Sequence, residues 1–124
     1  MSVTPNVAQT PAPKPPNRVE VQWRGEHKFD AGRPGRPLIR IDGDGTTGPG
    51  RVDTLLSALA CCASVDVVDI LAKRRTPLQS MSIEVIGTRV DTTPRRLKHV
   101  LLRFRLGGAG IDRENAERAI ALSI

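Results

Sequence analysis

The most constraining feature of this sequence is the apolar stretch at residues 48–75, GPGRVDTLLSALACCASVDVVDILAKRR. Its opening glycines and proline predict a turn, because glycine tolerates positive φ angles and proline fixes its own. Asp53 follows as an N-cap or first-turn carboxylate, which the free amides of a helix start favour. Apolar residues then recur every three or four positions and predict one wide apolar helix face: Leu55, Leu56, Leu59, Ala60, Ala63, Val67, Ile70 and Leu71.

The predicted helix ends in a basic turn, residues 73–75, and Pro77 prevents its continuation. We expect it to be too short, and too interrupted by Asp66 and Asp69, to span a membrane. The sequence therefore predicts a buried helix that presents Cys62 from inside the fold.

Alternating apolar and polar residues predict strands on both sides of this helix. The predicted strands cover residues 18–24, 27–30 and 38–42 before the helix, and 80–90 and 97–106 after it. The first strand should have one solvent-exposed face. The last two strands, joined by a short polar link, should form a hairpin. Asp112 is expected to cap a final helix. The order β-β-β-α-β-β-α indicates an α+β fold with a mainly antiparallel sheet.

The chain divides into a short arm and a single domain. Residues 1–17 hold five of the ten prolines and predict a disordered or extended arm, which leaves 18–124 as the domain. No apolar run follows a basic N-terminus, so we expect no signal peptide and a cytoplasmic protein with reduced thiols. The final helix reaches the end of the chain without a stop signal, and we expect the chain to break off inside that element.

Cys61 and Cys62 are the strongest candidates for chemistry. Neighbouring helical side chains point about 100° apart, so a disulfide between them is not expected, and a zinc site would need more ligands. Cys62 is either a buried structural thiol or a reactive thiolate, which requires a nearby cation. Asp66, one turn further along the same face, opposes a thiolate. The possible activating residues include Arg24, Arg33, Arg36, Arg40 and Arg89.

Other polar residues have simpler interpretations. Asp53 lies about 2.5 turns before Cys62, on the opposite side of the helix, so capping is its expected role. His27 and His99 are expected on outward strand faces. The segment DGDG at 42–45 lacks the further ligands of a calcium loop and predicts a turn. The net charge of +6 is scattered, and no aromatic residues interleave with the basic ones on the outward face of the strand at 97–106, so nucleic acid is not favoured as a partner.

The stretch at 48–75 resembles the OsmC/Ohr family, and more closely its less characterised OsmC-like branch than the organic hydroperoxide resistance proteins proper. The resemblance extends over about residues 18–124, including IRIDGDG at 39–45 and GIDRENAERAIALS at 110–123. The matching positions of the helix are Gly48, Pro49, Asp53, Leu55, Leu56, Ala58, Leu59, Cys62, Asp66, Val67, Val68, Ile70, Leu71, Lys73 and Arg75.

This resemblance implies an intertwined homodimer whose antiparallel sheets wrap around central helices, with active sites at the dimer interface. It also implies thiol peroxidase chemistry in oxidative stress defence, in which Cys62 attacks an organic or lipid hydroperoxide and becomes a sulfenic acid. No bound cofactor or metal is implied, and an external dithiol, such as a lipoylated protein, would be the reductant.

The chain departs from the family pattern at three places. The family's second, resolving cysteine follows a few residues after the position of Ser123, and this chain ends at Ile124, so the C-terminal segment is expected to be incomplete. Cys61 stands where the family has a small residue and is a candidate for the resolving role, although its position next to Cys62 on a helix argues against it. Val52 occupies the place of an activating glutamate, with Asp53 beside it, and Arg24 is the positional candidate for the activating arginine.

Two further functions stay open. Without a resolving cysteine and an Arg–Glu pair, the chain would be a non-catalytic OsmC-like dimer that binds a small apolar or acyl ligand. A basic nucleic-acid-binding module is the third possibility, and salt-dependent binding to a duplex would support it. No membrane partner is expected.

Overall fold

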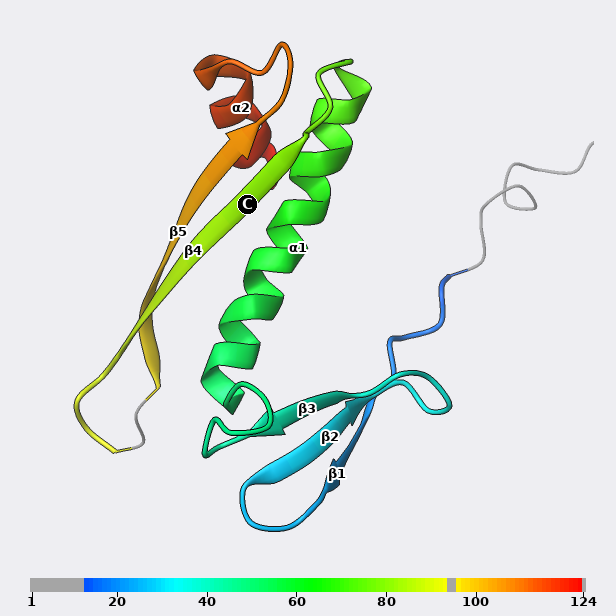
Figure 1. Ribbon diagram of the computed structural model, residues 1–124, viewed down its shortest axis with the longest axis vertical. Coiled ribbons are helices and arrows are strands. Elements are labelled where there is room, and N and C mark those ends of the chain that lie inside the picture. Colours follow the sequence, from blue (N-terminus) through cyan, green and yellow to red (C-terminus); the bar gives the residue numbers. More distant parts are fainter. Residues whose placement is uncertain (1–12, 94–95, 124) are drawn as a thin grey trace, which may run out of the picture.

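The computed structural model describes residues 13–93 and 96–123 (Figure 1). Its elements follow in the predicted order β-β-β-α-β-β-α, which confirms the α+β fold class. They are β1 (Glu20–Trp23), β2 (Lys28–Gly32), β3 (Ile39–Asp42), α1 (Arg51–Lys73), β4 (Ser80–Arg89), β5 (Leu97–Gly107) and α2 (Arg113–Ser123).

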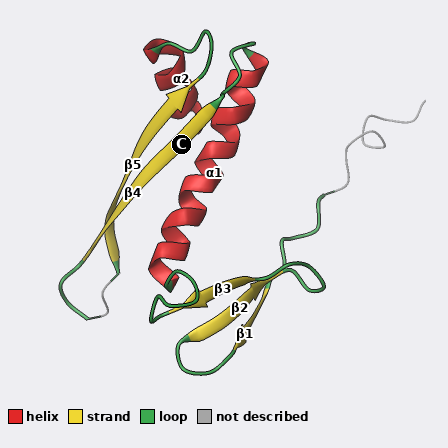
Figure 2. Cartoon of the chain, viewed as in Figure 1, coloured by secondary structure: helices red, strands yellow, loops and turns green. Residues whose placement is uncertain are grey.

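The strands form two separate antiparallel sheets. β1, β2 and β3 pair in sequence order, and β4 pairs with β5 as the predicted hairpin, with Ile83 opposite Phe104. Figure 2 shows the hairpin running beside α1, while the three-stranded sheet lies at the N-terminal end of that helix. The helix α1 is therefore the element that both sheets share.

The core forms where the second half of α1 meets α2 and the hairpin. Val67, Leu71 and Ala119 are fully buried there. The inward residues of β4 and β5 alternate with exposed ones as the sequence predicted, and Met81, Phe104 and Leu106 pack against the core. The following residues complete it: Ile70, Leu78, Ile111 and Ile120.

The helix termini confirm one capping prediction and decide another. Asp112 caps α2 as predicted, because its Oδ1 accepts the Asn115 amide at 2.8 Å. The N-cap of α1 is Gly50, which offers no side-chain hydrogen bond, so Asp53 is the first-turn carboxylate and not the N-cap. The C-cap of α1 is Arg74. The helix α1 therefore ends at Lys73, before the chain reaches Pro77.

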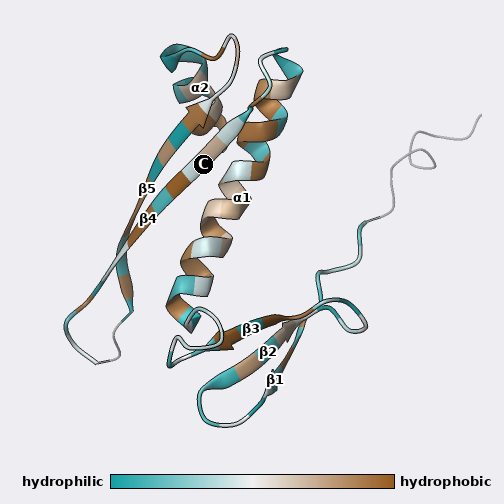
Figure 3. Ribbon diagram, in the orientation of Figure 1, coloured by the Kyte–Doolittle hydropathy of each residue, from teal (hydrophilic) through white to brown (hydrophobic). Residues whose placement is uncertain are grey.

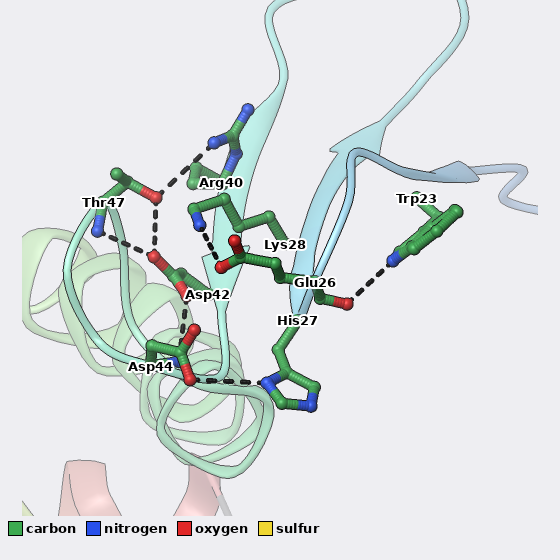
Figure 4. Close-up of polar contacts among 8 residues, drawn as sticks. All are labelled: Trp23, Glu26, His27, Lys28, Arg40, Asp42, Asp44 and Thr47. Carbon is green, nitrogen blue, oxygen red and sulfur yellow. Dashed lines mark hydrogen bonds and ion pairs between the residues drawn. The ribbon is translucent and has the colours of Figure 1, made fainter.

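The DGDG segment is a turn organised by Asp42, which is buried (Figure 4). Its carboxylate accepts the Asp44 amide at 2.9 Å and the amide and hydroxyl of Thr47 at 2.9 and 2.8 Å. These hydrogen bonds, the Thr47 amide first, hold the pKa of Asp42 well below its usual range. The Asp42 amide donates to the Pro49 carbonyl at 2.8 Å, so this turn ties the three-stranded sheet to the start of α1.

The prediction of a buried central helix is wrong for the single chain. Within α1 the buried residues are Ala60, Ala63, Val67 and Leu71, and both cysteines are exposed. Leu55 and Leu59, predicted to share that buried face, are also exposed. The predicted face is thus wider than the surface that β4, β5 and α2 cover. Figure 3 shows that apolar residues occur along most of α1.

A second apolar stripe runs along α1, away from its own core. It consists of Ala58, Cys61, Val65, Val68 and Ala72, all exposed, and we call it the outer stripe. Its spacing of three and four residues is the pattern of a helix–helix seam. At about 100° per residue, Val65 lies about 160° around the helix from the buried Val67. The helix therefore has two apolar faces. Within the described residues, the face that includes Val67 is covered and the outer stripe is not.

Two further expectations need correction. β1 does not have one buried face, because all four of its residues are exposed, with Trp23 at 65%. The helix α1, with 23 residues, is long and apolar enough to cross a membrane by length and composition alone, so the judgement that it is too short was wrong. The core helix of a soluble protein passes the same test.

The proline-rich arm falls largely outside the described residues. Residues 1–12 are not described, and residues 13–17 are exposed and form neither helix nor strand. The division into an arm and a domain therefore stays a prediction.

Candidate functional site

Cys62 lines a pocket of about 390 Å³ between α1, β5 and the end of α2. Leu59 and Asp66 lie on the same side of α1 as Cys62, because they are three residues before it and four residues after it. Val100 and Leu102, on the inward face of β5, form the opposite wall. The lining residues are Leu59, Cys62, Ala63, Asp66, Val100, Leu102 and Ser123. The exposed thiol of Cys62 thus opens onto a mostly apolar cavity large enough for a small organic molecule.

Cys61 does not line this pocket, although it is also a free, exposed thiol. The two side chains diverge by about 100°, which places Cys61 in the outer stripe. The structure thereby gives the two thiols different surroundings, whereas in the sequence only the family resemblance singled out Cys62. It also agrees with the expectation that neighbouring helical cysteines do not form a disulfide.

The charge at the pocket is negative. Asp66 lines the wall one helical turn from Cys62, as its spacing predicted, and Ser123 is the other polar residue. Within residues 13–93 and 96–123, Asp66 forms no ion pair and no lysine or arginine lines the pocket. The described part of the single chain therefore places no cation at the pocket to stabilise a Cys62 thiolate.

Arg24 lies at the end of β1, on the three-stranded sheet, and not at the Cys62 pocket. Its guanidinium donates to Asp30 at 3.2 Å and to Gln22 at 2.6 Å. Asp30 also accepts from Arg40 at 2.7 Å, and this bond is the main reason that the pKa of Asp30 lies below its usual range. Both arginines are thus held by the same carboxylate.

Asp53 lies at the N-terminal end of α1, apart from Cys62, as the helical spacing predicted. It lines a separate polar hollow with Asp42, Arg51 and Arg89. This arrangement fits a first-turn carboxylate and gives Asp53 no contact with the pocket of Cys62.

The two histidines are exposed, as expected, although His27 lies in the turn before β2 and not on a strand. His27 lies beside Asp44, with 3.3 Å between its Nδ1 and the carboxylate (Figure 4). Neither histidine lines the Cys62 pocket. Among the described residues, no group of three or more His, Cys, Asp or Glu side chains is placed to hold a metal ion.

Sequence reasoning missed the far wall of the pocket and the outer stripe. Val100 and Leu102 were predicted to point inward, but nothing in the sequence placed them opposite Cys62. Ser123 was seen only as part of the final helix. The outer stripe could have been found, because its three-and-four spacing is readable in the sequence.

Comparisons with known proteins show which family this fold belongs to. The sequence model of one family, OsmC, described as OsmC-like protein, matches residues 43–124. Protein YhfA of Escherichia coli (strain K12) is 30% identical over 86 residues, which cover 68% of this chain and 64% of YhfA. The match therefore spans less than two thirds of that relative's length.

Solved structures share the fold. An OsmC-like protein from Mycoplasma pneumoniae superposes with a TM-score of 0.73 at 16% identity, covering 86% of this chain and 78% of that one. A candidate osmotic stress induced and detoxification response protein from Psychrobacter arcticus 273-4 gives 0.73 at 16% identity, covering 89% and 83%. At such identities the likeness concerns the fold alone, whereas the family model matches most of the sequence, the Cys62 helix included. The chain belongs to the OsmC-like family.

Proposed function

We propose that this protein is an OsmC-like thiol peroxidase that reduces organic or lipid hydroperoxides in oxidative stress defence, with Cys62 as the attacking residue. The observation that carries the proposal is the position of Cys62 on a mostly apolar pocket that Cys61 does not share. An apolar cavity suits the hydrocarbon part of an organic hydroperoxide, and an exposed thiol can meet its peroxide group.

The proposed reaction has two stages. The Cys62 thiolate attacks one peroxide oxygen, an S–O bond forms, and the O–O bond breaks to release an alcohol after it takes up a proton. Cys62 is left as a sulfenic acid. One thiol of an external dithiol then attacks the sulfur and releases water, and the second thiol displaces Cys62 and closes the dithiol's own disulfide. The two electrons that reduce the peroxide thus come from the dithiol, for which a lipoylated protein is the proposed source.

Cys61 is an unsuitable resolving residue in this scheme. Its side chain belongs to the outer stripe, about 100° around α1 from Cys62. Closing a disulfide between them would require the helix to distort at its centre. The proposal therefore assigns the resolving step to the external dithiol.

We also propose that the working form is a homodimer. The outer stripe leaves Val65 at 59% and Val68 at 42% exposure, and β1 exposes Val21 and Trp23 as well. Apolar surface of this extent is typical of a subunit interface. A second copy would also bring further cations toward Cys62, and Arg24 is the first residue to test for that role, since it does not reach the pocket within its own chain.

A second candidate function rests on a specific observation. No cation lines the pocket in the described part of the single chain, and a thiol without a cation is a poor nucleophile. An OsmC-like dimer that binds a small apolar or acyl ligand in the same cavity would need no thiolate. The two functions use one pocket and differ only in whether Cys62 reacts.

Sulfenic acid trapping separates these functions. The protein is treated with one equivalent of cumene hydroperoxide in the presence of dimedone, and intact mass is measured for the natural chain, Cys62→Ser and Cys61→Ser. We expect one fast dimedone adduct on the natural chain and on Cys61→Ser, and none on Cys62→Ser. An adduct that forms only through Cys61, or no adduct within minutes, would refute the peroxidase proposal and leave the ligand-binding dimer.

A further inference from the structure

The charge of the Cys62 pocket has a consequence for what can enter it. Asp66 and Cys62 are four residues apart on α1, so their side chains are neighbours on the helix surface, and both line the pocket. The remaining lining is apolar except for Ser123, whose hydroxyl donates to the Ala119 carbonyl at 2.7 Å. Asp66 therefore supplies the only formal charge among the described lining residues.

Nothing in the described part of the chain neutralises this carboxylate. The positions three and four residues away from it on α1 are Cys62, Ala63, Asp69 and Ile70, none of which is basic. Across the pocket, Leu102 points inward, while its neighbour Arg103 is exposed on the other face of β5. Arg103 and Arg105 thus lie on the face of the sheet turned away from Asp66, while Lys98, near the start of β5, is exposed and does not line the pocket.

We propose that Asp66 is a specificity-determining residue: it makes the Cys62 pocket prefer neutral apolar hydroperoxides and disfavour those that carry a carboxylate close to the peroxide group. The choice of peroxide rests on the peroxidase function proposed above. The charge preference itself does not, because it concerns any small electrophile that approaches the Cys62 sulfur.

The size of the effect follows from Coulomb's law. Side chains four residues apart on a helix lie about 6 Å apart. Two unit charges at that distance, in surroundings with an effective dielectric constant of about 40 to 80, repel enough to slow an anionic reagent about 3- to 10-fold relative to a neutral one. Salt weakens this discrimination, since the site is open to solvent.

The test uses two alkylating agents of nearly equal shape, neutral iodoacetamide and anionic iodoacetate. It is done on the full chain carrying Cys61→Ser, so that Cys62 is the reacting thiol. The ratio of the two rates is measured, because any change in the thiolate fraction of Cys62 affects both rates equally and cancels. Asp66→Asn removes the charge, Asp66→Glu keeps it, and Asp69→Asn is the matched control that removes an equal charge outside the pocket lining.

We expect the preference for iodoacetamide to fall about 3- to 10-fold in Asp66→Asn, to persist in Asp66→Glu and Asp69→Asn, and to shrink with added salt in the parent. With peroxides, Asp66→Asn should raise kcat/KM by a similar factor for a hydroperoxide whose carboxylate lies close to the peroxide group, relative to neutral cumene hydroperoxide. An alkylation ratio that is the same in Asp66→Asn and the parent overturns the proposal, whether or not the protein is a peroxidase. Conversely, an absent sulfenic acid adduct on Cys62 defeats the proposed function while the alkylation ratio still decides the role of Asp66.

Discussion

The outer stripe offers the sharpest test of the proposed assembly. Val65 lies in the middle of the stripe and is 59% exposed in the single chain. If a second copy packs there, Val65→Asp places a carboxylate in the centre of the interface. In the separated subunit the same side chain stays in water, so the substitution should leave the fold intact and act on association.

The magnitude follows from the exposed fraction. Fully burying a valine side chain contributes about 1.5–3 kcal/mol, so covering the exposed part of Val65 contributes about 1 kcal/mol in each subunit. A two-fold symmetric interface contains the substitution twice, which doubles the loss. Burying two unpaired carboxylates adds at least several kcal/mol. The total exceeds about 4 kcal/mol, equivalent to a dissociation constant about 1,000-fold higher.

Sedimentation equilibrium over a range of concentrations measures this change, and circular dichroism checks the fold of each variant. Ile86→Asp is the control, because Ile86 is a similarly apolar residue, 39% exposed, on the outward face of β4. We expect a dimer for the natural chain and for Ile86→Asp, and a folded monomer for Val65→Asp. A Val65→Asp chain with the association constant of the natural one would show that the outer stripe is not the interface.

Two further predictions concern the turn between β3 and α1. Gly48→Ala should destabilise the protein by about 1–3 kcal/mol in urea unfolding, because a Cβ at Gly48 would overlap the Arg40 carbonyl oxygen, whereas Gly50→Ala meets no atom closer than 3.7 Å and should have little effect. The depressed pKa of Asp42 predicts a stability contribution that is complete above the unfolded-state value of about 3.9 and is lost as the pH falls toward the folded-state value. Urea midpoints measured against pH should therefore fall less steeply below pH ~4 in Asp42→Asn, and parallel curves would contradict this role.

The sequence was sufficient for the elements because each carries its own periodicity. The alternation in β4 and β5 and the three-and-four spacing in α1 are local patterns, and they predicted the element order, the hairpin and the inward residues. The cap at Asp112 was also local, since its partner Asn115 lies three residues away.

The site could be predicted only in part. The spacing of Cys62 and Asp66 on one helix is local, so their shared surface was foreseen. The opposite wall comes from β5, and its level against α1 depends on the packing of the whole domain. The prediction that α1 would be buried failed for a related reason: an apolar face shows that something must cover it, and not that the same chain does so.

The difference between Cys61 and Cys62 shows how chemically identical neighbours acquire different surroundings. Each thiol stands on the same backbone, and one step along the helix turns one toward a cavity and the other away from it. That rotation is fixed by Val67 and Leu71, which are fully buried about one and a half and two and a half turns further along. Which of the two thiols faces the pocket is therefore decided by aliphatic residues that do not line it, and a change that turned α1 about its axis would exchange the surroundings of the two thiols without altering either one.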